Sequence, residues 1–210
     1  MNRLPHLSGL YAITDPKLTP DEVLLDKVEA ALVGGTRIVQ YRDKSQDHSK
    51  RKHQAQSLKT LCEQHRATFI VNDDVELALA VNAHGVHLGL EDIAISAARE
   101  MLGENAIIGA TCHGDIANAH TAIAEGADYV AFGRFYPSTT KPDAPQASLD
   151  ELSPLIAELS KPAVAIGGIT LANAPQLRAA GFAMVAVIAD IFGQNDIAGH
   201  CHRYAELFQD

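Results

Sequence analysis

Three short stretches of this sequence decide the fold: VQYRDK at residues 39–44, FIVNDD at 69–74 and VHLGLED at 86–92. Each begins with apolar, β-favouring residues and ends in cations, carboxylates or amides, after which a helical pattern follows. In a β/α protein the carboxyl ends of parallel strands all lie on one face, and that face carries the chemistry. The three stretches therefore predict a polar rim built from neighbouring strand ends.

Outward from these stretches, the whole chain alternates between strand and helix patterns. The runs that predict strands are apolar on both faces, as parallel strands covered by helices are, and they are residues 10–14, 37–41, 68–71, 85–88, 107–111, 129–132, 163–166 and 184–188. The predicted helices are residues 21–33, 47–65, 74–82, 95–102, 115–125, 149–159, 172–180 and 196–208.

This alternation predicts an α/β protein with a single domain over residues 1–210, folded as a (β/α)8 TIM barrel. An open doubly wound sheet is the alternative, but a Gly-rich turn usually follows its first strand. Here Thr14, Asp15 and Pro16 follow instead. The long connection at residues 133–148, after the sixth strand, is a candidate lid.

Composition limits the function classes. A hydrophobic content of 47% with 20% charged residues is typical of a globular protein. The formal net charge of −9 argues against nonspecific binding of nucleic acid or an anionic membrane.

Cys62, Cys112 and Cys201 are widely spaced and form no metal-type pair, which favours a reducing compartment. With no signal-peptide pattern and no 18-residue apolar run, the expected location is the cytoplasm. Self-association into a homo-oligomer is left open.

Two carboxylates on the predicted rim suggest a metal site. Asp73 and Asp92 follow the third and fourth strands, and neighbouring parallel strands lie ~4.8 Å apart. Magnesium prefers one or two carboxylates, with waters and substrate phosphate oxygens completing its octahedron. The alternative is that Asp73 or Asp74 caps the third helix and Asp92 caps the fourth. Nearby cations at Arg42 and Lys44 favour the metal site.

Groups suited to a phosphorylated substrate lie on the same rim. Arg42 offers bidentate hydrogen bonds to phosphate and Lys44 a compact charge, although a pair of solvated loop cations is the alternative. Gln40 lies on the strand face of Arg42 and offers an amide to an uncharged heterocycle. Glycines at 167 and 168 would let phosphate approach the main chain after the seventh strand; a tight turn with no ligand is the other interpretation.

The ten histidines suggest no catalytic arrangement. Most, including His200 and His202 in the last predicted helix, are expected at the surface. His87 and His113 lie in or just after strands, where a hydrogen-bonded core histidine is commoner than a catalytic one. No Ser/His/Asp or Cys/His arrangement stands out.

Five motifs in family order resemble those of the thiamine-phosphate synthase family, and together they cover nearly the whole chain. They are QYRDK at 40–44, VNDD at 71–74, GVHLGLED at 85–92, YPSTTK at 136–141 and AIGGIT at 165–170. Each motif alone is weak evidence for this family, whereas five motifs in the family's order are specific to it. The resemblance implies a Mg²⁺-assisted transferase that couples a pyrimidine diphosphate to a thiazole phosphate and releases pyrophosphate. It also implies a dissociative route, which needs no protein nucleophile.

The resemblance assigns residues to each ligand. For the pyrimidine diphosphate they are Gln40, Tyr41, Arg42, Asp43, Lys44, Asn72, Thr111 and Lys141, of which Arg42, Lys44 and Lys141 are catalytic. For the thiazole phosphate they are Ser138, Thr139, Thr140, Gly168, Ile188 and Ala189. Asp73 and Asp92 would ligate Mg²⁺. Two positions depart from the common pattern, because Ala189 and Thr111 stand where serine is frequent.

Two other functions compete with this interpretation. A thiazole tautomerase of the same fold would bind only the thiazole partner and would not need Arg42, Lys44, Asn72 and the two aspartates together. A noncatalytic thiamine-phosphate-binding protein would have no need of the metal pair or of Lys141. The partners expected in each case are small phosphorylated molecules.

Overall fold

A closed barrel of eight parallel strands, in the order β1 to β8, forms the centre of the computed structural model, which describes residues 7–138 and 145–209. The strands are β1 (Gly9–Ile13), β2 (Ile38–Tyr41), β3 (Thr68–Asn72), β4 (Gly85–Leu88), β5 (Ile107–His113), β6 (Tyr129–Phe132), β7 (Ala163–Ile166) and β8 (Met184–Val187). Each strand pairs with its neighbour in sequence, and β1 pairs with β8 to close the barrel.

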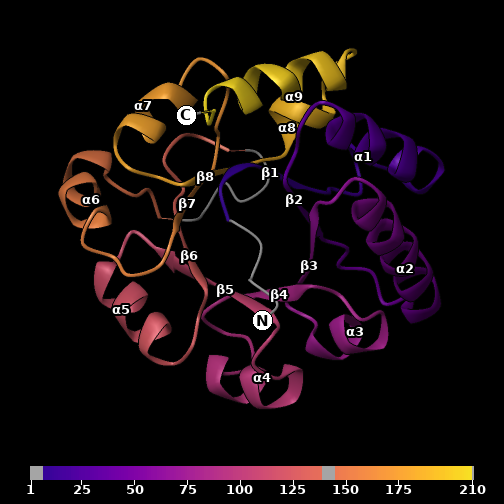
Figure 1. Cartoon of the computed structure of the whole chain (residues 1–210), viewed down its shortest axis with the longest axis horizontal. Coiled ribbons are helices and arrows are strands. Elements are labelled where there is room, and N and C mark those ends of the chain that lie inside the picture. Colours follow the sequence, from indigo (N-terminus) through magenta and orange to yellow (C-terminus); the bar gives the residue numbers. More distant parts are fainter. Residues whose placement is uncertain (1–6, 139–144, 210) are drawn as a thin grey trace.

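Helices surround this inner ring of strands (Figure 1). They are the 3-10 helix η1 (Asp21–Val23) and the α-helices α1 (Leu24–Val33), α2 (His48–Gln64), α3 (Val75–Ala80), α4 (Ile95–Leu102), α5 (Ile116–Ala124), α6 (Leu149–Ile156), α7 (Ala174–Ala179), α8 (Ala189–Phe192) and α9 (Ile197–Glu206). The predicted (β/α)8 barrel is confirmed, and all eight strands lie where the apolar runs predicted them. The described residues contain no helix long and apolar enough to cross a membrane.

Two differences from the expected elements have simple causes. The first helical segment begins as η1, and only from Leu24 is it an α-helix. Helix α8 was not predicted, because four residues are too short for a helical period to show in the sequence. It follows directly on β8, so it belongs to the same rim as the other strand ends.

Alternation along each strand separates two apolar layers. Residues such as Val39 and Phe69 point outward and pack with the helices in the larger cluster. Residues such as Ile38 and Ile70 point inward and fill the barrel in a smaller cluster. The inner layer also contains Tyr11 and Tyr129, so the interior of this barrel is partly polar.

Side-chain caps fix where several helices begin after the strands. The side chains that accept a backbone N–H in the first turn are Asp47 at α2, Asp74 at α3, Asp115 at α5, Ser148 at α6 and Asp196 at α9. Such caps satisfy N–H groups that have no partner within the helix. Because they set the first turn, they also set the length of the loop that carries the rim residues.

The opposite end of the barrel is held by a buried ion cluster. The Arg99 guanidinium donates to Asp128 Oδ2 at 2.7 Å, and the same oxygen accepts the Ile108 N–H at 3.0 Å. Lys161 Nζ lies 3.5 Å from Asp128 Oδ1. The cluster joins α4 to the starts of β5 and β6, so its role is structural.

Candidate active site

A charged cluster lies at the carboxyl ends of β2, β3 and β4, as the three stretches predicted. The Lys44 ammonium group pairs with the Asp73 carboxylate. Asp92 Oδ2 accepts the Gly89 N–H at 2.6 Å. Burial, and then interaction with Asp73, raise the pKa of Asp92. Burial acts to raise the pKa of Asp73 too, but its hydrogen bonds with Lys44 and Asp92 outweigh burial and lower it. The two carboxylates are thus close enough to interact directly.

Backbone geometry tests the capping interpretation of these aspartates. Asp73 adopts a left-handed conformation (φ 63°), which non-glycine residues rarely do, and its N–H donates to the His87 carbonyl at 2.8 Å. Asp74 caps α3 through Leu77 N, so the capping interpretation is confirmed for Asp74. It is wrong for Asp92, because α4 has Ala94 at its N-cap and no side-chain cap.

A cleft of ≈ 550 Å³ opens beside this cluster. Its lining comes mainly from the loops after β2, β3 and β4 and includes the predicted site residues Lys44, Asn72, Asp73 and Asp92. Asp43 and Arg51 also line it. Arg42 lies in the same loop as Lys44, and its N–H donates to Thr14 Oγ1 at 2.9 Å. Among the described residues its guanidinium has no ion-pair partner, so this charge is available to an anion.

Gln40 and Thr111 lie at the barrel interior near the same rim. Gln40 Nε2 donates to the Tyr11 hydroxyl at 2.7 Å, and the Gln40 side chain is buried. Thr111 Oγ1 lies 3.0 Å from His87 Nε2. His87 is therefore a buried, hydrogen-bonded histidine, as the commoner of the two interpretations predicted.

Two other predicted residues turn their side chains away from the barrel interior. The Tyr41 hydroxyl donates to Gln54 Oε1 of α2 at 2.7 Å, on the helix-facing side of β2. The Asp43 carboxylate pairs with Lys50 Nζ at 2.7 Å and accepts the Ser45 N–H at 2.6 Å. These contacts brace the loop that carries Arg42 and Lys44.

The described residues among those predicted for the thiazole phosphate, Ser138, Gly168, Ile188 and Ala189, follow β6, β7 and β8, across the barrel from the charged cluster. Ile188 is the N-cap of α8 and Ala189 its first residue. Gly168 has φ 65°, and a Cβ there would overlap the Pro137 carbonyl and Tyr136. Glycine is therefore required at position 168, because the chain packs closely against it there. Ser138 ends the described segment, and Thr139, Thr140, Lys141 and the rest of the candidate lid up to residue 144 lie outside the described residues.

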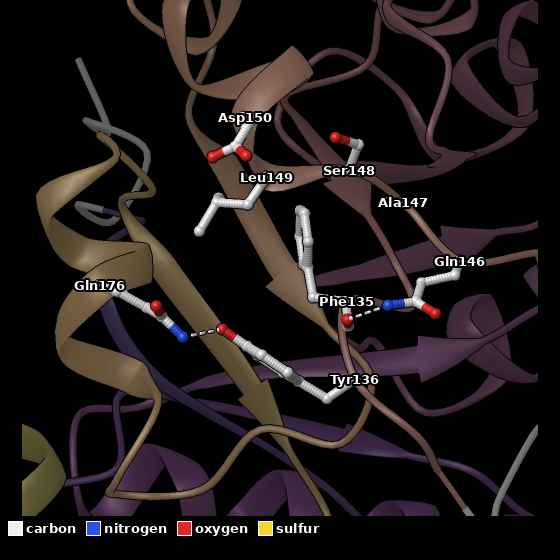
Figure 2. A pocket seen from close by; sticks show the side chains of 8 residues that line it. All are labelled: Phe135, Tyr136, Gln146, Ala147, Ser148, Leu149, Asp150 and Gln176. Atoms are coloured by element: carbon white, nitrogen blue, oxygen red, sulfur yellow. Dashed lines mark hydrogen bonds between the residues drawn. The ribbon is translucent and has the colours of Figure 1, made fainter.

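A second cleft, of ≈ 510 Å³, lies between α6, α7 and the segment after β6 (Figure 2). The side chains of Gln176 and Tyr136 are hydrogen-bonded across it, and Gln146 Nε2 donates to the Phe135 carbonyl at 3.2 Å. Of the predicted site residues that the structure describes, none lines it. Its contacts fix Tyr136 against α7, immediately before the predicted phosphate-binding residues begin.

The sequence did not predict a polar cluster around Asp190, beside the loops after β7 and β8. Asp190 Oδ2 accepts the Leu171 N–H at 3.1 Å and the Tyr204 hydroxyl at 2.7 Å, and lies 2.8 Å from His200 Nε2. The expectation that His200 is a surface residue is wrong, since it is only 8% exposed. The cluster ties the loop after β7 to α8 and α9, and only the spacing of His200 and Tyr204 on one helix face hinted at it.

This fold and rim define an enzyme class: a (β/α)8 barrel whose strand ends gather cations and carboxylates to act on small phosphorylated molecules. A family model described as thiamine monophosphate synthase matches residues 10–191. Thiamine-phosphate synthase of Alcanivorax borkumensis is 55% identical over 92% of this chain and 89% of the relative. That of Thioalkalivibrio sulfidiphilus is 51% identical over 97% and 96%.

A solved structure of thiamine phosphate pyrophosphorylase from Pyrococcus furiosus is 34% identical, with a TM-score of 0.86 over 95% of each chain. The chain belongs to the thiamine monophosphate synthase family. It is accordingly a transferase of thiamine biosynthesis.

Proposed function

We propose that this chain condenses 4-amino-2-methyl-5-(diphosphooxymethyl)pyrimidine with a thiazole phosphate, giving thiamine phosphate and pyrophosphate. The thiazole partner is 4-methyl-5-(2-phosphoethyl)thiazole or its 2-carboxy form, whose carboxyl group would leave as carbon dioxide. The observation that carries the proposal is the meeting of Lys44, Asp73 and Asp92 at three consecutive strand ends, in a chain of this family. The three buried thiols form no disulfide, which supports a reducing location such as the cytoplasm.

The donor set fits Mg²⁺. The described residues hold no group of three or more His, Cys, Asp or Glu residues suited to a metal, so the protein offers the two carboxylates of Asp73 and Asp92. Such a pair suits Mg²⁺, which usually keeps waters and takes its remaining ligands from substrate phosphates. A cation there would also relieve the repulsion between the two carboxylates. When bound, Mg²⁺ would neutralise charge on the diphosphate.

The remaining rim residues bind and orient the pyrimidine diphosphate. Arg42 and Lys44 hold the diphosphate, and Lys141 stabilises the negative charge that develops on the departing pyrophosphate. Asn72 and Thr111 supply further hydrogen bonds at the ends of β3 and β5. Gln40 holds the ring from inside the barrel. The side chains of Tyr41 and Asp43 act on substrate indirectly, through the loop that they brace.

The reaction proceeds by dissociation. The bond from the pyrimidine methylene carbon to the diphosphate oxygen breaks first, and the electron pair leaves with pyrophosphate. The amino group of the ring stabilises the resulting pyrimidinylmethyl cation, which the thiazole nitrogen captures to form the new C–N bond. Ser138, Thr139, Thr140, Gly168, Ile188 and Ala189 hold the thiazole phosphate for this step. The protein supplies position and electrostatic stabilisation rather than a nucleophile.

A coupling assay with both substrates, with magnesium and with a chelator, tests the proposal. Magnesium-dependent formation of thiamine phosphate is the expected result. Isomerisation of a thiazole phosphate without any coupling would instead identify a tautomerase. Binding of thiamine phosphate without either reaction would identify a noncatalytic binding protein.

A further inference from the structure

A chain of polar side chains crosses the interior of the barrel, and its middle members, Tyr11, Tyr129 and His87, have no role in the assignment above. It begins at Gln40 Nε2, which donates to the Tyr11 hydroxyl at 2.7 Å. The Tyr11 and Tyr129 hydroxyl oxygens are 2.8 Å apart, and the Tyr129 oxygen lies 3.0 Å from His87 Nδ1. His87 Nε2 then lies 3.0 Å from Thr111 Oγ1. The chain thus joins the two interior residues assigned to the pyrimidine diphosphate.

Burial makes the direction of these hydrogen bonds matter. Tyr11 is 1% exposed and Tyr129 is 0% exposed, so bulk water cannot accept their protons. Burial also raises the pKa of both phenols, so both hydroxyls keep their protons at neutral pH. Every proton in the chain therefore needs an acceptor inside the protein.

The direction of the chain is coupled to the orientation of the Gln40 amide: with Nε2 donating to Tyr11, as in the structure, only one direction gives each hydroxyl proton an acceptor among these side chains. Gln40 donates to Tyr11, Tyr11 donates to Tyr129, and Tyr129 donates to His87 Nδ1. His87 then donates from Nε2 to Thr111, whose own proton stays available toward the rim. In the reverse direction the Tyr11 oxygen would receive two donors, and its proton would have no acceptor in the described structure.

Packing holds this chain in place. The Tyr129 ring stacks on His87 with centroids 5.6 Å apart and meets the Tyr11 ring edge-on at 6.0 Å. Gly109 lies beneath the Tyr129 ring, and a Cβ at that position would overlap the ring. The aromatic rings, and with them the distances between the polar atoms of the chain, are therefore fixed by packing.

The other amide atom of Gln40 is open. Gln40 Oε1 has no hydrogen-bond partner within the described residues, and it is not among their fully buried unpaired polar atoms, which are Thr36 Oγ1, Ser45 Oγ and Arg51 Nε. Gln40 lies near the carboxyl end of β2, at the rim end of the barrel. Its Oε1 can accept a hydrogen bond from a ligand bound there.

We infer that Tyr11, Tyr129 and His87 are positioning residues that hold the Gln40 amide with its NH2 group inward and its carbonyl oxygen toward the ligand. This orientation selects a heterocycle with an exocyclic amino group, which donates to Gln40 Oε1, over one with an oxo group, whose lone pairs would face that oxygen. The inference rests on the proposed function, because it specifies how that substrate's amino group is recognised.

The test compares binding of the aminopyrimidine diphosphate and of its 4-oxo analogue, each by calorimetry without the thiazole substrate. Tyr11→Phe removes the acceptor of Gln40 Nε2, so the amide is free to turn over. We expect the preference for the amino compound to fall at least about tenfold, the ratio that one neutral hydrogen bond supplies. Thiazole phosphate binding should not change.

Two further variants separate positioning from stability. Tyr129→Phe breaks the next link while keeping the ring stack, so it should lower the same preference even if Tyr11→Phe does not fold. Tyr204→Phe is the matched control, because it also removes a buried, hydrogen-bonded hydroxyl, but from α9. It should leave the preference at the wild-type value.

The outcomes separate the two proposals. If both barrel variants keep the wild-type preference, or if Tyr204→Phe loses it equally, the inference is overturned and the proposed function stands. A wild-type protein that does not bind the aminopyrimidine diphosphate overturns the proposed function, and the inference with it.

Discussion

Replacing Asp92 with asparagine is the sharpest test of the metal assignment, because stability and metal binding should respond differently. Asp92 lies beside Asp73, and burial together with this neighbour raises its pKa. Asparagine removes the like-charge repulsion, and its amide oxygen can still accept the Gly89 N–H that Asp92 accepts. Without magnesium, the variant should therefore be at least as stable as the wild-type protein.

With magnesium present, the wild-type protein should become more stable than Asp92→Asn. A ligand present at 100 times its dissociation constant stabilises the native state by about 2.7 kcal/mol. For a chain of this size, each kcal/mol changes Tm by about 2–4 °C, so the wild-type Tm should rise by about 5–11 °C. If Asp92→Asn weakens binding about a hundredfold, the same magnesium concentration gives only about 0.4 kcal/mol, or about 1–2 °C.

Thermal unfolding across a magnesium titration measures both quantities, and the coupling assay gives the rate. Asp74→Asn is the matched control: it makes the same chemical change in the same cleft, and asparagine is also a good N-cap for α3. It should keep the wild-type magnesium shift. Equal shifts in wild-type and Asp92→Asn proteins, with an unchanged magnesium-dependent rate, would refute the assignment.

Four other changes test the remaining parts of the structure. Arg42→Ala should weaken the pyrimidine diphosphate at least about tenfold and leave thiazole phosphate binding unchanged in separate titrations. Lys141→Ala should lower kcat about 10²-fold and Lys141→Arg should recover only part of it, whereas a change in KM alone would make Lys141 a binding residue. Asp128→Ala leaves the Arg99 guanidinium buried without its partner, so denaturant unfolding should show a loss of about 3–5 kcal/mol; a loss below 1 kcal/mol would contradict this. Burial lowers the pKa of His84 below the ordinary histidine value of 6.5. The unfolded chain therefore takes up the proton first, and stability should fall as pH drops below about 6.5. His84→Asn should flatten that slope in unfolding measured between about pH 7.5 and 5.5, and an unchanged slope would exclude His84 as its source.

The parts of the fold that sequence could predict are those with a local signal. An apolar run followed by a helical period identifies a strand and its helix, and both lie within about twenty residues. The barrel topology then brings successive strand ends together, which is why Asp73 and Asp92 could be placed side by side. By contrast, the capping role of Asp92 was an equally local hypothesis, and it failed because the carboxylate turns back to Gly89 instead of forward to α4.

Gly168 illustrates a limit of interpreting a residue type by its chemistry. A glycine after the seventh strand was expected to allow phosphate to approach the main chain. In the structure the space that a Cβ would occupy is filled by Tyr136 and the Pro137 carbonyl. A variant such as Gly168→Val would displace the segment after β6 before it obstructed any ligand. Loss of thiazole phosphate binding in that variant would therefore not identify the phosphate site.

The interior chain shows why other site residues stay hidden in the sequence. Tyr11 and Tyr129 are separated by 118 positions, and their contact exists only because the barrel closes with β1 and β6 facing each other across its interior. Each tyrosine alone is one polar residue in an apolar strand. Their common inward register with Gln40 could be inferred from period-2 alternation, but their partners depend on ring size and on Gly109. The specificity that we infer therefore depends on long-range closure, whereas the charges proposed to bind phosphate follow from local strand ends.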